Sequence, residues 1–320
     1  MTGVALGLAS RRGAAVARDY VFAHFRRQHL EKFLPGLAKL GLSGEPHAVA
    51  CALYHFRSNA LGGVRTEFYR ESDRKAWVRY PPPRWIWHGT AIAGVPSEVC
   101  AAMLHGWHGH NGVSLGNPRL GFVCTGMTVD GMPGLEGYYL EHDRELSPSE
   151  RVRFAYGEET MPPAQSMPAL DPKEWPEERL ERTHRAYALE YVRTMLRVLP
   201  EVAGSLDELG RVARLIGLQY HEALAAELGY PTNLSEGTPR SAELFARWLE
   251  DVLRGHGEKV EREGSVVRMS GWKLGEGVPA PDAAFKAWNE LWVGACAAHD
   301  RFLKLSVARA PREAEWSIAP

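Results

Sequence analysis

Residues 105–112 read His105-Gly106-Trp107-His108-Gly109-His110-Asn111-Gly112, and the rest of the chain is organised around this stretch. An apolar run precedes it, behind Ser97, a residue type that often caps the start of a helix. We therefore predict a helix from 97 to about 109. Two segments with strand character follow, 120–128 and 135–142, around a turn that contains glycine and proline.

The same plan, two helices and a hairpin followed by a helix and a hairpin, occurs twice along the chain. In the first half, the earlier segments are helices at 9–40 and 47–60 and a hairpin at 64–70 and 75–80. In the second half, the corresponding segments are 207–228, 241–254, 259–263 with 265–269, 282–300, and 302–307 with 315–318. We predict an internally duplicated α+β fold, in which helices pack on one face of antiparallel sheets.

The predicted duplication divides the chain into three parts. Residues 1–145 form the first repeat unit, and residues 204–320 form the second. Between them, 146–203 combines an acidic, proline-rich connection with a long helix.

Composition excludes several classes of protein. The 320 residues carry a formal net charge of -1, which argues against a general nucleic-acid binder. The four cysteines are scattered, so neither a cysteine-rich zinc module nor a disulfide framework is indicated. No apolar run is long enough to span a membrane. We expect a cytoplasmic protein whose partner is a small molecule.

The two predicted units differ at the stretch that holds the histidines. Where the first has His105, His108, His110 and Asn111, the second has Glu290, Val293, Ala295 and Cys296. The second unit is thus more apolar, which suits scaffolding or pairing into a homodimer. We expect the functional pocket in the first unit.

Three interpretations of the histidines stay open. His105 and His108 are three residues apart, so on one helix they share a face, and His110 can fold back toward them. They can hold a divalent transition metal, together with a carboxylate. They can instead act as acid-base or substrate-binding groups without a metal, or as structural groups at a helix end. The carboxylates considered for this site are Glu141, Asp130 and Glu67, with His142 beside them.

Two further side chains have a functional and a structural interpretation each. Arg57 can bind a substrate carboxylate or pair with a surface acid. Cys124 can be a nucleophile if a histidine lowers its pKa, or a small buried hydrophobe in a strand.

Residues 217–229, Gly-Leu-Gln-Tyr-His-Glu-Ala-Leu-Ala-Ala-Glu-Leu-Gly, carry a resemblance, together with the closing hairpin that holds Thr128, Gly131 and Tyr138. The repeated unit resembles the 4-vinyl reductase domain and the L-2-amino-thiazoline-4-carboxylate hydrolase-like proteins. The resemblance implies a pocket for a small organic molecule between sheet and helices. Where those modules carry a cysteine, this chain has Leu135-Glu136-Gly137 before Tyr138, so cysteine chemistry is not carried over.

These observations favour an enzyme, a hydrolase or lyase that acts on a small polar or heterocyclic metabolite. In this hypothesis His105, His108 and Glu141 are catalytic. The residues expected to contact the substrate are His110, Asn111, Arg57, Trp107 and Tyr138. The alternatives are a non-catalytic sensor, whose pocket is lined by the same histidines with Trp85, Trp87 and Trp107, and a structural partner protein that pairs through its second unit.

Overall fold

The computed structural model of the chain describes residues 1–82, 94–231, 241–310 and 313–320. It divides into two compact units, Met1–Thr194 and Met195–Pro320, and each is described by itself. The boundary falls inside a long helix, so the predicted connection 146–203 is not a separate part. Most of it belongs to the first unit.

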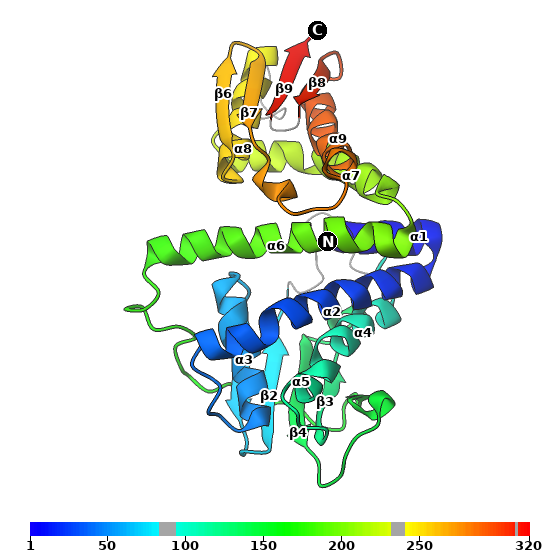
Figure 1. Ribbon diagram of the computed structural model, residues 1–320, viewed down its shortest axis with the longest axis vertical. Coiled ribbons are helices and arrows are strands. Elements are labelled where there is room, and N and C mark those ends of the chain that lie inside the picture. Colours follow the sequence, from blue (N-terminus) through cyan, green and yellow to red (C-terminus); the bar gives the residue numbers. More distant parts are fainter. Residues whose placement is uncertain (83–93, 232–240, 311–312) are drawn as a thin grey trace. The chain divides into compact units, whose positions relative to one another are not determined.

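The first unit begins with three helices, continues with strands and two shorter helices, and ends with most of a long helix (Figure 1). Its helices are α1 (Thr2–Arg12), α2 (Ala14–Lys39), α3 (His47–Leu61), α4 (Ser97–Gly106), α5 (His108–Ser114) and most of α6 (Glu177–Ala203). Its strands are β1 (Glu67–Arg70), β2 (Lys75–Tyr80), β3 (Leu120–Gly126), β4 (Leu135–Glu141) and β5 (Val152–Phe154).

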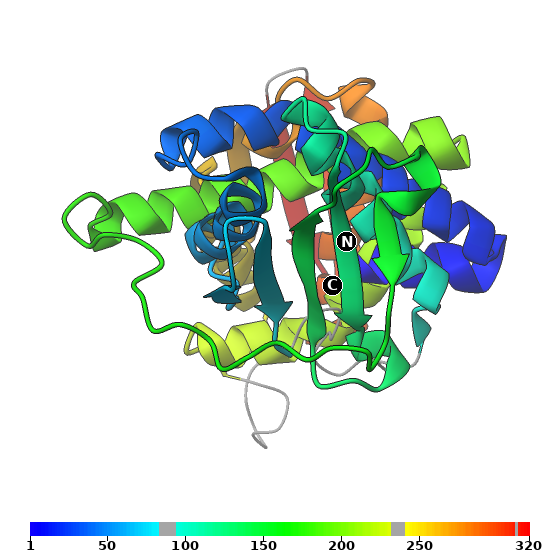
Figure 2. The ribbon, with the colours of Figure 1, turned by 90° about the horizontal axis from the view of Figure 1, so that it is seen from below.

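These strands form one sheet in the order β1-β2-β4-β3-β5, with helices over one face (Figure 2). All neighbours are antiparallel except β3 and β5. Successive side chains of a strand point to opposite faces. Tyr139 therefore faces the helices, where it contacts His55, whereas Tyr138 packs with Trp77 and Met161 on the other face.

The second unit contains the end of α6, three further helices and a sheet of its own. Its helices are α7 (Asp207–Glu227), α8 (Ala242–Gly255) and α9 (Pro281–His299). Its strands are β6 (Lys259–Glu263), β7 (Val266–Ser270), β8 (Lys304–Ala310) and β9 (Glu313–Ala319), in the antiparallel order β6-β7-β9-β8. The core between helices and sheet is aromatic, with Phe245, Trp248, Trp292 and Trp316 all buried.

The predicted α+β class is confirmed, and the second unit follows the predicted order of helices and hairpins. In the first unit the single helix predicted at 9–40 is two helices, α1 and α2, separated at Gly13, where φ is 91. The strand order β1-β2-β4-β3 of the first sheet also matches β6-β7-β9-β8 of the second. A duplication of one ancestral unit stays a prediction, because shared topology alone does not establish common descent.

Two glycine contacts indicate an alignment of the two units that differs by three residues from the alignment used in the sequence analysis. A Cβ at Gly106 of α4 would lie 2.6 Å from the carbonyl oxygen of Phe22 in α2. A Cβ at Gly294 of α9 would lie 2.1 Å from the carbonyl oxygen of Arg214 in α7. When these glycines are taken as equivalent, Asn111 matches His299. The second unit is therefore not purely apolar at this place.

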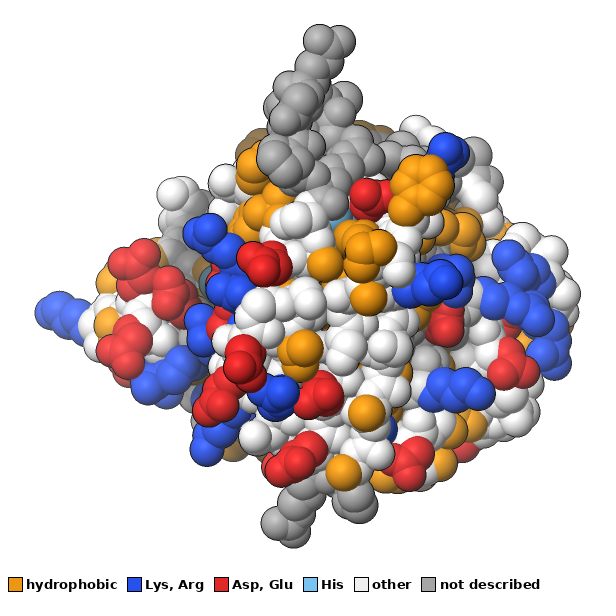
Figure 3. All heavy atoms as spheres, turned by 90° about the horizontal axis from the view of Figure 1, so that it is seen from above, with side chains coloured by type: hydrophobic (Ala, Val, Ile, Leu, Met, Phe, Trp, Pro, Cys, Tyr) orange, Lys and Arg blue, Asp and Glu red, His pale blue; other side chains and the backbone are white. Residues whose placement is uncertain are grey.

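None of the described helices combines the length and the apolarity that crossing a membrane requires. On the face that Figure 3 shows, Lys and Arg side chains lie among Asp and Glu side chains. This mixture agrees with the small net charge of the chain.

The glycine contact between α7 and α9 generates a first prediction. Gly294→Ala should lower the free energy of unfolding by about 2 kcal/mol, because the added methyl group meets backbone that cannot move aside. Urea titration followed by tryptophan fluorescence measures this change. Gly210→Ala is the matched control, since its Cβ would find its nearest neighbour at 3.6 Å. This control should be neutral or stabilising by up to about 1 kcal/mol. Equal stability of the two variants would contradict the prediction.

Candidate functional site

The predicted helix over 97–109 is interrupted in the middle of the histidine stretch. Helix α4 ends at Gly106, Trp107 has φ -111 and ψ -70, and α5 begins at His108. Side chains three residues apart share a face only on a continuous helix. Here His108 is buried, whereas His105 and His110 are half-buried and have other neighbours.

His108 lies in a stack of rings between α3 and the sheet. Its ring is parallel to that of His55, with the centroids 4.3 Å apart, and to that of Tyr139 at 5.8 Å. The Tyr80 hydroxyl oxygen is 3.3 Å from His108 Nε2. Asn111 Nδ2 donates a 2.8 Å hydrogen bond to the Tyr139 hydroxyl. Side chains from α3, α5, β2 and β4 thus meet at one buried polar centre.

A cavity of about 30 Å³, the inner cavity, adjoins this centre. His55, Tyr80 and His108 line it, together with Asn59 and residues of the neighbouring helices. The volume is sufficient for a water molecule, and the lining offers it polar partners. The inner cavity therefore suits a small polar group.

A larger cavity of about 410 Å³, the aromatic pocket, lies between α2, α3 and α6. Its rings are Tyr54 of α3, Trp107, and Tyr187 and Tyr191 of α6. Ser58, Trp107, Tyr187 and Tyr191 line both cavities, so the two spaces are neighbours.

Two glycines allow rings to lie directly on helix backbone beside the aromatic pocket. A Cβ at Gly36 of α2 would be 2.6 Å from the Tyr54 ring, and a Cβ at Gly62 would be 2.7 Å from the Tyr187 ring. Real Cβ atoms do not approach so closely, so these positions require glycine. The sequence thereby makes room for aromatic side chains along the pocket wall.

Most charges around the aromatic pocket are paired with each other; the exposed Lys39 instead lies over the Trp175 ring, 5.3 Å from its centroid. Lys32 Nζ is 3.3 Å from a Glu190 carboxylate oxygen, and Arg193 is 3.0 Å from the same carboxylate. Burial raises the pKa of Glu190 and these two cations lower it, with a net downward shift. Glu31 pairs with Arg27 at 3.1 Å. The pocket thus presents mainly ring surface.

Several histidines of the first unit are held in the neutral form. Burial, together with the nearby Arg26 and His110, lowers the pKa of His29 to about 3. Burial also lowers the pKa values of His105 and His110. A neutral imidazole donates one hydrogen bond and accepts another.

The predicted metal site is not found. Among the residues that the structure describes, no three His, Cys, Asp or Glu side chains are placed to hold a metal ion. The His105 ring neighbours Phe154 at 5.8 Å, and the His110 ring neighbours Phe22 at 6.2 Å. His108 instead points into the core. The three histidine side chains have different neighbours because the helix is interrupted at Trp107.

The predicted partner carboxylates lie elsewhere. Glu141 is bound to Arg119 at 2.6 Å and to Asn117 at 3.0 Å, and it does not line either cavity beside His108. Asp130 accepts a hydrogen bond from Ser97, and Glu67 pairs with Arg79.

Two predicted substrate contacts are also separated from the histidines. Arg57 donates to the carbonyl oxygen of Leu40 at 3.0 Å, and it lines a different surface pocket beside residues 167–175. Tyr138 lies on the other face of the sheet, where its hydroxyl donates to Glu159. Trp107 and Asn111 do lie at the site. Trp85 and Trp87 fall outside the described residues.

His55, Tyr80 and Tyr139 form the polar centre with His108, and the sequence interpretation missed all three. His55 stands beside Tyr54 in the sequence, but its pairing with His108 spans 53 positions of chain that no local pattern connects. The sequence interpretation chose Tyr138 in place of its neighbour Tyr139, and adjacent residues of a strand point to opposite faces of the sheet. Cys124 fits its structural interpretation, because it is fully buried in β3, and this burial raises the pKa of its thiol to about 12.

Adjacent tyrosines on β4 test which face of the sheet holds the site. Tyr139→Phe should lower the free energy of unfolding by about 1–3 kcal/mol, because it leaves the buried Asn111 amide without its acceptor. Tyr138→Phe, the matched control, loses a bond to the partly exposed Glu159 and should cost less than about 1 kcal/mol. Chemical unfolding measures both, and the reverse ranking would contradict the assignment.

The lowered pKa of His29 generates a pH-dependent prediction. An unfolded histidine titrates near 6.5, whereas the pKa of folded His29 is about 3. Between these values the unfolded state binds the additional proton, so stability falls as pH falls. His29→Phe should make the profile of unfolding free energy between pH 6 and 4 shallower by about 1.4 kcal/mol per pH unit. Parallel profiles for the wild type and the variant would refute this.

The chain matches no protein-family model, no curated protein and no solved structure. Function is therefore argued from the residues of the site and their chemistry.

Proposed function

We propose that the first unit is a small-molecule-binding module whose aromatic pocket receives a planar, largely apolar ligand. The observation that carries this proposal is the set of four rings, Tyr54, Trp107, Tyr187 and Tyr191, around a cavity of about 410 Å³. Pockets for small molecules typically have this size and combine aromatic walls with a few polar groups.

The form of the pocket indicates the kind of ligand. Tyr54 and Trp107 lie nearly parallel, 27° apart, and Tyr187 and Tyr191 lie together on α6. Flat ring systems stack on such surfaces in offset or edge-to-face geometry. Glu31, Lys32 and Glu190 at the pocket are already paired, which favours an uncharged ligand body. The remaining cation, Lys39, is exposed and lies over the Trp175 ring.

The inner cavity gives the ligand a polar end. A hydroxyl, carbonyl or ring nitrogen that enters from the aromatic pocket would meet His55, Tyr80 and His108. The resemblance to the 4-vinyl reductase domain and the L-2-amino-thiazoline-4-carboxylate hydrolase-like proteins implies a pocket of this kind, and we retain it as part of the proposal.

A second candidate is an enzyme, a hydrolase or lyase that uses the same pocket. The specific observation in its favour is the contact between the Tyr80 hydroxyl and His108 Nε2 at the inner cavity. A tyrosine and a histidine in contact can pass a proton to or from a bound ligand. Mass spectrometry of the recovered ligand separates the candidates: a binding module returns it unchanged, whereas an enzyme converts it and Tyr80→Phe slows the conversion.

Binding of 2-naphthol, a planar fluorescent probe, tests the first proposal. The full chain should bind about one equivalent. Ser58→Phe should weaken binding at least tenfold, because the added ring fills the space that both cavities share. Tyr187→Ala should weaken it severalfold, since a stacking surface is lost.

Tyr156→Ala provides the matched control, because this tyrosine is 41% exposed and lines neither cavity. Unfolding curves show whether each variant keeps its fold. If Ser58→Phe and Tyr187→Ala bind the probe as tightly as the Tyr156→Ala control does, the aromatic pocket is not the binding site.

A further inference from the structure

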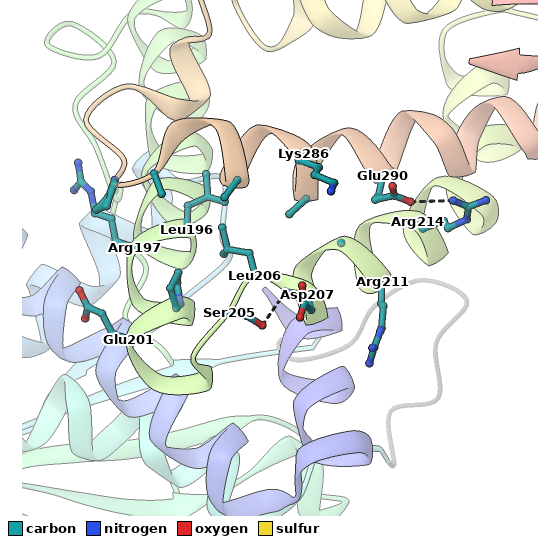
Figure 4. A pocket seen from close by; sticks show the side chains of 16 residues that line it. Leu196, Arg197, Glu201, Ser205, Leu206, Asp207, Arg211, Arg214, Lys286 and Glu290 are labelled. Carbon is teal, nitrogen blue, oxygen red and sulfur yellow. Dashed lines mark hydrogen bonds and ion pairs between the residues drawn. The ribbon is translucent and has the colours of Figure 1, made fainter. Parts of the chain in front are cut away.

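A cavity of about 740 Å³ lies within the second unit, where the end of α6 and the starts of α7 and α9 come together. We name it the α7–α9 cavity. Figure 4 shows Leu206 at the start of α7 and Lys286 of α9 projecting into the space between the two helices, whereas Arg211 extends away from it.

The walls of the α7–α9 cavity are mostly apolar. Leu196 and Pro200 come from α6, Leu206 precedes α7, and Ala283 and Ala287 come from α9. Leu196 and Ala287 are buried, and Ala283 is exposed at the rim. Covering such a surface with an apolar group lowers the free energy, because apolar area is removed from water.

One cation of the cavity has no partner within the described part of the chain. Arg214 is bound to Glu290 at 2.9 Å, and Arg197 donates to the carbonyl oxygen of Gly277 at 3.0 Å. Lys286 lies one turn before Glu290 and makes neither a hydrogen bond nor an ion pair with any described residue. Two acids, Glu201 and Asp207, also line the cavity. Asp207 likewise makes no ion pair with a described residue, but it lies in the first turn of α7, where the helix dipole stabilises its charge.

The backbone at the cavity carries an independent signal. Ala280 has φ 48 and ψ 60, and within the described ranges it is the one residue other than glycine with a positive φ. A side chain with a Cβ rarely adopts this conformation, and such residues concentrate at functional sites. Ala280 lines the α7–α9 cavity beside Pro279.

From these observations, we propose that the α7–α9 cavity binds an amphiphile with a single alkyl chain and a carboxylate head. The chain lies against Leu196, Leu206 and Ala287, and the carboxylate lies at Lys286. The apolar walls select the alkyl chain, and the unpaired cation selects a negative head over a positive one. This site shares no residue with the aromatic pocket, so the two proposals stand or fall separately.

Titration calorimetry of the full chain with decanoate, below its micelle-forming concentration, tests the proposal. Ala283→Trp should abolish this binding, because an indole at the rim occupies the space of the alkyl chain. Lys286→Gln should weaken decanoate binding about fivefold, the effect of a partly exposed ion pair. The same variant should not weaken binding of decylammonium, which has an equal chain and the opposite charge.

Lys259→Gln on β6 is the control, since it removes the same charge at an exposed position outside the cavity. Its decanoate affinity should equal that of the wild type. No decanoate binding, or binding that Ala283→Trp leaves unchanged, overturns the site. Equal affinities of Lys286→Gln and Lys259→Gln overturn the assignment of the head group.

Discussion

The contact of α4 with α2 is the constraint on which the first unit depends. Because Gly106 has no side chain, α4 can touch the backbone of Phe22 and Arg26 directly. A Cβ there would lie 2.6 Å from a carbonyl oxygen, so any other residue would push the helices apart. The helix ends at this contact, and the break at Trp107 turns the following residues toward the sheet. His108 lies just after this break and is buried in the core.

The polar centre around His108 is held by stacking as much as by hydrogen bonds. Parallel rings of His55, His108 and Tyr139 fill the space between α3 and β4, and Tyr80 approaches from β2. Burying polar groups costs free energy unless they find partners, so such a group of rings constrains each orientation tightly. Natural cores place polar groups in this way most often where function requires them. The neighbouring aromatic pocket supplies a reason for keeping them here.

The sequence predicts the elements and the class of the fold better than it predicts the site. Helix periods and glycine stops reveal the order of helices and hairpins, because those signals are local. The site depends on features that a local pattern does not contain. One is the break at Trp107, which no helix stop signal of the sequence marks. Another is the face of β4 that meets the helices, where a difference of one residue replaces Tyr138 by Tyr139. The third is the partner His55, which only the tertiary fold brings to His108.

The two units use the same topology in different ways. In the second unit, His221 Nε2 lies 3.2 Å from His299 Nδ1, and His299 occupies the place that corresponds to Asn111. Phe245 and Trp248 pack directly against this pair, with ring centroids 5.9 and 4.6 Å from His221. Large side chains therefore surround the polar pair of the second unit, and the α7–α9 cavity lies away from it, between the starts of the two helices. Under a duplication, one ancestral arrangement of helices on a sheet would have kept space beside its polar centre in the first unit. The second unit would have closed that space with aromatic packing and left its free volume near the helix starts.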